Sequence, residues 1–151
     1  MSKSLHSRFA LAVAMFALVL LAVAGCGKKT PYQLVKVRGT VKYADGTPIK
    51  ADRLQLVFRP QVTPTGTLPP PEGKAEVDVK TGTFSGVTSY EFEDGVVAGK
   101  NKVIAIVWVL PPKGPPQLST EVPKSVTNAA TTPIMVDTSE SRNLEIKIPK
   151  E

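Results

Sequence analysis

The side chains that react most readily are scarce in this chain of 151 residues, which holds one cysteine, Cys26, and one histidine, His6. A lone cysteine cannot form a disulfide within the chain, so we expect another use for the Cys26 thiol. Cys26 directly follows a long uncharged run, residues 9–25, and is followed after Gly27 by two lysines. The thiol therefore lies where an apolar segment meets a basic one, and these flanking segments predict its chemistry.

The first 25 residues have the order of a secretory leader. Residues 1–8 are polar with two cations. Residues 9–25 form an apolar stretch of 17 residues, between the roughly 7–15 of a signal-peptide core and the roughly 20 of a membrane-spanning helix. We predict that residues 1–25 form a signal helix that is cleaved, and that Val23, Ala24 and Gly25 are recognised by the signal peptidase. The alternative is an uncleaved membrane anchor in which Cys26 is inert.

The stretch Val23-Ala24-Gly25-Cys26 resembles the lipobox of bacterial lipoproteins. The resemblance implies that the Cys26 thiol carries a diacylglyceryl group and that its amine, freed by cleavage, receives an N-acyl chain, with no other cofactor. Two or more acyl chains hold a protein firmly on a membrane. Residues 26–34 are then a lipidated tether, and the protein is extracytoplasmic and membrane-attached. In lipoproteins of a Gram-negative envelope, an Asp after the cysteine is a signal for retention in the inner membrane. Because Gly27 stands at that position, the resemblance implies attachment to the outer rather than the inner membrane.

Charge and composition argue against several classes of function. Without residues 1–25 the net charge falls from +6 to +4, with 17 basic and 13 acidic residues and no long run of one sign, so we expect no nucleic-acid partner. Cleavage also removes His6, which excludes histidine-dependent catalytic triads and histidine metal sites. The carboxylates are scattered, and no Ser–Lys motif stands out. We therefore expect no enzymatic activity and no metal.

Apolar and polar residues alternate with a period of two along most of residues 35–149, which predicts β-strands. No segment after residue 25 has a helical apolar repeat, and all 14 prolines follow residue 30. Asp45-Gly46 and Thr81-Gly82 predict turns. The run 101–110 is almost entirely apolar and predicts a central strand buried on both faces. The predicted strands cover residues 35–43, 53–60, 74–79, a segment containing Phe84, 101–110, 133–138 and 142–149.

The motifs in this region resemble those of the small lipoproteins of planctomycete-type bacteria that carry a transthyretin-like or carboxypeptidase-regulatory-like domain. They are "VRGTVKYADGTPI" at 37–49, "LVFRP" at 56–60, "TGTFSG" at 81–86, "GKNKV" at 99–103, and "TTPIMV" at 131–136. The chain departs from the family pattern at Thr81, Asn101-Lys102 and Val126. The resemblance implies an all-β, immunoglobulin-like (transthyretin- or prealbumin-like) Greek-key β-sandwich of about seven strands, and a non-catalytic accessory or binding module.

The best candidates for ligand contacts are Tyr90, Glu91, Glu93 and Asp94 in one acidic loop. The carboxylates are oxygen ligands of the kind that Ca²⁺ takes, although their spacing matches no calcium motif. A solvated loop explains them equally. Tyr90 could stack against a sugar, whereas Trp108 lies in the apolar run and is expected to be a core residue.

Two proline-rich stretches, residues 60–73 and 111–123, are either stiff connections or docking surfaces for a partner. The sequence therefore predicts a lipid-anchored module of the cell envelope with a structural or protein-interaction role. The alternative is a carbohydrate- or small-ligand-binding module on the same anchor. The expected partners are the membrane and envelope proteins or glycans.

Overall fold

The computed structural model describes residues 30–150, so Cys26, its neighbours Val23, Ala24 and Gly25, and the predicted signal helix lie outside the described residues. The described chain is all-β apart from one short 3₁₀ helix, η1 (Lys124–Thr127). No helix within residues 30–150 is long and apolar enough to cross a membrane. The strands are β1 (Leu34–Val35), β2 (Arg38–Tyr43), β3 (Arg53–Pro60), β4 (Gly73–Asp78), β5 (Thr83–Phe84), β6 (Val96–Val97), β7 (Lys100–Val109), β8 (Gln117–Leu118), β9 (Met135–Asp137) and β10 (Asn143–Ile148).

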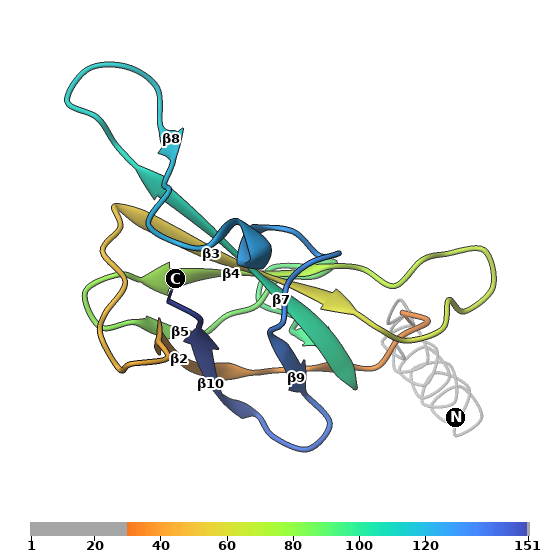
Figure 1. Ribbon diagram of the computed structural model, residues 1–151. Helices are drawn as coiled ribbons and strands as arrows, with labels where there is room; N and C mark the ends of the chain where they lie inside the picture. The colour runs from red at the N-terminus through yellow and green to blue at the C-terminus, as the bar shows by residue number, and fades with distance from the viewer. Residues whose placement is uncertain (1–29, 151) are drawn as a thin grey trace, which may run out of the picture. The chain divides into compact units, whose positions relative to one another are not determined.

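Most strands belong to one sheet with the order β10-β2-β5-β4-β3-β7-β8, in which β9 also pairs with β7 (Figure 1). Neighbouring strands are antiparallel except β10 and β2, which pair in parallel over six residues. A second ladder of two strands joins β1 to β6. β10 therefore returns from the end of the chain to lie beside the first long strand.

The sheet curls around a single hydrophobic core. Alternate residues of β2 and β10 point into this core, and so do alternate residues of β3, β4 and β7. The largest fully buried side chains are Phe58, Leu54, Leu56, Ile146 and Ile148. The period-two pattern that predicted these strands is thus the pattern of their burial.

Each of the seven predicted strand segments contains a strand, and both predicted turns are present. The N–H of Gly46 donates to the backbone carbonyl of Tyr43 at 2.9 Å, and the N–H of Gly82 donates to the backbone carbonyl of Asp78 at 2.7 Å. Both glycines have positive φ, 85° and 67°, which a residue with a Cβ adopts only at a cost.

Two predictions about strands are corrected. Segment 35–43 is not one strand, because residues 36 and 37 belong to no strand and residues 34–35 pair with β6 rather than continuing β2. The strand at 101–110 is buried on both faces only around Val103, Ile104 and Ala105. Farther along, Val107 lies in the core, but Ile106 and Trp108 on the other face are half-buried. In a run of apolar residues without alternation, the sequence does not indicate which face of the strand is buried.

Candidate functional site

The acidic loop of residues 89–95 is closed by the Asp94 carboxylate. This group accepts hydrogen bonds from the backbone N–H groups of Ser89, Tyr90 and Glu91 at 2.7, 2.9 and 2.8 Å. Partial burial acts to raise the pKa of Asp94, but the hydrogen bonds outweigh it, so the pKa lies below its ordinary value. Asp94 therefore organises the loop as an anion that caps backbone donors.

The other two acids of the loop do not join Asp94 in a cluster. Glu91 and Glu93 are exposed, and the N–H of Glu93 donates to the Thr88 hydroxyl at 3.1 Å. Within residues 30–150, no group of three or more Asp, Glu, His or Cys side chains lies close enough together to hold a metal ion. The loop offers a ligand its aromatic side chains rather than a cage of oxygens.

Two aromatic residues of this loop are exposed. The side chain of Tyr90 is 44% exposed, and that of Phe92, which the sequence analysis did not single out, is 85% exposed. A large apolar residue between two glutamates in a polar loop was the signal that could have identified Phe92. Burial raises the pKa of Tyr90, and the nearby Tyr32 and Asp94 add to the shift. The loop thus presents two aromatic side chains to solvent.

The prediction that Trp108 is a core residue is wrong. The Trp108 indole lies on the outer face of β7, opposite Arg53 of β3 in register. The guanidinium of Arg53 lies over the ring, 5.1 Å from its centroid, and also donates to Glu76 at 2.6 Å. A cation over an indole face is a favourable pairing that partly covers the ring. Trp108 is therefore a half-buried surface residue.

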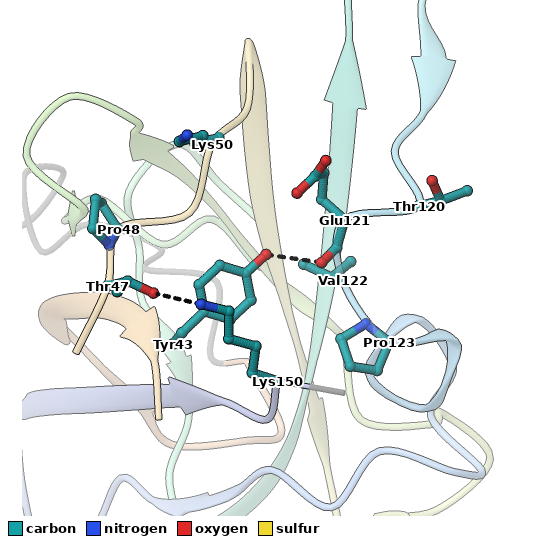
Figure 2. Close-up of a pocket in the computed structure, with 9 residues that line it drawn as sticks. All are labelled: Tyr43, Thr47, Pro48, Lys50, Thr120, Glu121, Val122, Pro123 and Lys150. Carbon is teal, nitrogen blue, oxygen red and sulfur yellow. Dashed lines mark hydrogen bonds between the residues drawn. The ribbon is translucent and has the colours of Figure 1, made fainter. Parts of the chain in front are cut away.

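A hollow of about 620 Å³ lies at the end of the molecule where β2 and β10 finish (Figure 2). Tyr43 at the end of β2 donates from its hydroxyl to the backbone carbonyl of Glu121 at 2.8 Å. Burial and the Glu121 carboxylate raise the pKa of Tyr43. The hollow is lined by Tyr43, Thr47, Pro48, Lys50, Thr120, Glu121, Val122, Pro123 and Lys150.

Lys150 closes part of this hollow. Its ammonium donates to the Asp45 carboxylate at 2.8 Å and lies 5.4 Å from the centroid of the Tyr43 ring. Hydrogen bonding from Lys150 and Thr47 keeps the pKa of Asp45 far below its ordinary range. Because Lys150 covers the Tyr43 ring, the ring gives no flat platform for a sugar. What the hollow offers is hydroxyl, ammonium and carboxylate groups along its rim.

A hairpin projects from the same end of the molecule. The end of β7 pairs with β8, Trp108 with Leu118 and Val109 with Gln117, and residues 110–116 connect them in a proline-rich turn (Figure 1). The N–H of Leu110 donates to the Asp52 carboxylate at 2.7 Å, which ties down the base of the hairpin.

This hairpin carries exposed apolar side chains and an open strand edge. Leu110 and Leu118 are 56% and 68% exposed. Within residues 30–150, β8 pairs only with β7, so its other edge has no strand partner. Unpaired edges are places where a further strand can add.

The predicted site residues thus fall into separate places. Tyr90, Glu91, Glu93 and Asp94 share one loop, and the proline-rich segment 111–123 forms the hairpin turn and one wall of the hollow. The lipidation residue Cys26 lies outside the described residues. No protein-family model matches the chain, and no curated protein or solved structure is significantly similar to it.

Proposed function

We propose that this protein is a lipid-anchored module of a bacterial cell envelope that binds another envelope protein and catalyses no reaction. In this proposal Cys26 carries the diacylglyceryl and N-acyl lipids after cleavage at Gly25. The domain then stands outside the cytoplasm on a membrane, with the outer membrane favoured. Support comes from the sequence order of charged start, apolar run, small residues and cysteine, with Gly27 next.

The proposed fold is an immunoglobulin-like, transthyretin-type Greek-key β-sandwich. Two features support it. The chain crosses between two parts of the sheet near its end, because β9 pairs with β7 whereas β10, the next strand, pairs with β2. The curled sheet also encloses one core between its β2–β10 part and its β3–β4–β7 part.

The observation that carries a protein-interaction role is the projecting β7–β8 hairpin. Its exposed leucines Leu110 and Leu118 lie beside an open strand edge, and the proline-rich turn stiffens the connection. An extended segment of a partner could pair along β8 while the leucines pack against it, which is the geometry of strand addition.

The anchor is tested by Cys26→Ser. We expect the wild-type chain to incorporate labelled palmitate and to stay with the membrane fraction. The variant should take up no label and accumulate as an unprocessed precursor. A processed, membrane-retained Cys26→Ser protein would show that the anchor assignment is wrong.

The interaction role is tested by site-specific photo-crosslinking in the native host. A photoreactive residue at Leu118 should give a discrete adduct with an envelope protein. The same residue at Lys147, an exposed position on β10, serves as the control and should give none. Identical adducts at both positions, or none at Leu118, would contradict a hairpin interface.

The hollow at the end of β2 favours a second candidate function, the binding of a carbohydrate or another small polar ligand. Thr47, Lys50 and Glu121 could form hydrogen bonds with ligand hydroxyls there. A glycan array with the full chain tests this function. Binding that is lost in Lys50→Ala places the ligand in the hollow, whereas binding that is lost in Tyr90→Ala places it on the acidic loop.

A further inference from the structure

The described chain begins at one end of the domain, beside two loops. The hydroxyl of Tyr32 donates to the carbonyl of Leu68 at 2.6 Å and accepts from the N–H of Thr65 at 2.7 Å, so residue 32 is bonded to the β3–β4 loop. Figure 1 shows this loop extending beside the start of the described chain. The N–H of Ala98, which follows β6, donates to the backbone carbonyl of Gln33 at 2.9 Å.

The acidic loop lies at the same end. β1 pairs with β6, which directly follows this loop, and a Cβ at Gly95 would overlap the carbonyl of Val35. Thr88, just before the loop, exchanges backbone hydrogen bonds with Lys74 at 2.8 and 2.9 Å, near the start of β4.

Three large apolar side chains are exposed on these two loops. Phe92 is 85% exposed, Leu68 59% and Tyr90 44%. Single exposed apolar residues are ordinary, but three of the six large exposed ones within residues 30–150 lie around the point where the chain enters the domain. Tyr and Trp are enriched at the boundary between lipid headgroups and acyl chains, and Phe and Leu are typical of the membrane-facing side of interfacial helices.

The sequence before residue 31 limits what can lie against this end. Five residue steps separate Cys26 from Pro31, and a fully extended chain of that length spans at most about 18 Å. If Cys26 is lipidated, as the proposed function states, the Tyr32 end of the domain is held within that distance of the bilayer. Interfacial side chains reach about 5–10 Å into the headgroup region, so the two loops are within reach of it.

We propose that Leu68, Tyr90 and Phe92 form a membrane-contacting surface that seats the domain on the bilayer with its Tyr32 end down. This inference rests on the proposed lipid anchor. The anchor fixes the distance to the membrane, and the apolar surface fixes the orientation. The projecting hairpin then faces away from the membrane.

The charges of this end predict how the contact depends on lipid composition. Glu91 and Glu93 flank Phe92, and an anionic surface repels them. Lys28 and Lys29 lie in the tether, where they attract anionic headgroups. We therefore expect the loops to contact the membrane through their apolar side chains, and to do so on purely zwitterionic lipid, with no anionic lipid present.

The test measures whether the loop reaches acyl chains. The full lipidated chain is reconstituted in phosphatidylcholine vesicles whose acyl chains carry bromine, which quenches tryptophan on contact. Phe92→Trp and Leu118→Trp are each made in a Trp108→Phe background, so that each protein has one tryptophan. Leu118 is the matched control because it is 68% exposed and lies on the hairpin. The unaltered chain is a second control. Its Trp108 lies eight residues along β7 from Lys100, a separation of about 26 Å.

We expect fluorescence loss for Phe92→Trp and little loss for Leu118→Trp or for native Trp108. Palmitate labelling of the same preparations separates the two proposals. A labelled chain whose Phe92→Trp signal is quenched no more than that of Leu118→Trp overturns the membrane-contacting surface and leaves the anchor in place. That result is also expected if the loops bind a glycan or a protein. An unlabelled chain that leaves the vesicles overturns the anchor, and the membrane surface with it.

Discussion

Asp94 is the residue on which the shape of the acidic loop depends, because its carboxylate accepts from three backbone N–H groups. We expect Asp94→Ala to lower the free energy of unfolding by about 1–3 kcal/mol, since three backbone donors, one half-buried and two exposed, lose a charged acceptor. Urea unfolding followed by circular dichroism measures this change. Glu91→Gln is the matched control, because no side-chain hydrogen bond of Glu91 is present in the structure, and it should change stability little.

The lowered pKa of Asp94 gives this contribution a defined pH dependence. A carboxyl whose pKa is lower in the folded than in the unfolded state stabilises the fold fully above its unfolded pKa of about 3.9, and the contribution is lost as pH falls through the folded pKa. The stability difference between wild type and Asp94→Asn should therefore be largest near neutral pH and shrink below pH 4. A difference that stays constant from neutral to acid pH would contradict this role.

Arg53 and Trp108 allow a second test at a single contact. Because the guanidinium covers one face of the indole, Arg53→Ala should shift the Trp108 emission maximum to longer wavelength as water reaches the ring. The loss in stability should be no more than about 1 kcal/mol, since the pair is at the surface. Arg59→Ala is the control: Arg59 lies on the same strand and pairs with Glu72 instead. An unshifted spectrum for Arg53→Ala would show that the two side chains do not stack in solution.

The pairing of β2 with β10 depends on the absence of a side chain at Gly39. Gly39 lies opposite Leu144 in the parallel ladder, and a Cβ there would overlap the Leu144 carbonyl. We expect Gly39→Ala to cost about 3 kcal/mol, because backbone cannot move aside as a flexible side chain can. Gly46→Ala is the control: it has positive φ but open space around it, so only backbone strain of about 1–2 kcal/mol is expected. Equal losses in urea unfolding would contradict the close approach.

The elements were predictable where one face of a strand is buried and the other is not. Strands β4 and β10 alternate in sequence as they alternate in burial, and both turns follow from glycines with positive φ. The short strands β6 and β8 were not predicted, because two residues carry no period. β5 is equally short but was predicted from the Thr81-Gly82 turn that leads into it. The outward face of Trp108 was not predictable either, since all its neighbours along β7 are apolar.

The candidate site was predictable only in part, for a related reason. The four residues of the acidic loop were found by type and proximity in sequence, but the role of Asp94 as a backbone cap depends on loop geometry. Asn101 is a further example. It is fully buried, and its side-chain amide donates to the carbonyls of Val97 and Gly99, which holds the turn between β6 and β7. Nothing in its sequence neighbourhood indicates this role.

The domain has two functional ends in our proposals. The Tyr32 end carries exposed Leu68, Tyr90 and Phe92, and the far end carries the hollow and the β7–β8 hairpin. A lipid anchor on Cys26 would leave the hairpin pointing into the envelope, where a partner can reach it. The orientation on the membrane and the partner interface thus support each other, because an interface at the Tyr32 end would compete with the bilayer.

This arrangement predicts that partner binding can be removed without disturbing the fold or the anchor. Leu118→Lys places a charge on the exposed edge strand, and charged side chains on edges oppose strand addition. Because Leu118 is 68% exposed, the free energy of unfolding of the Leu118→Lys variant should differ from that of wild type by no more than about 0.5 kcal/mol. Palmitate labelling and membrane retention should equal those of wild type. Since position 118 is now altered, the photoreactive residue is placed at Leu110 instead, and its crosslinked adduct with the partner should disappear in the Leu118→Lys background. Phe92→Ser is the opposite case and should leave the adduct intact while the domain loses its orientation on the bilayer. If Leu118→Lys keeps the adduct, the partner does not use the β8 edge.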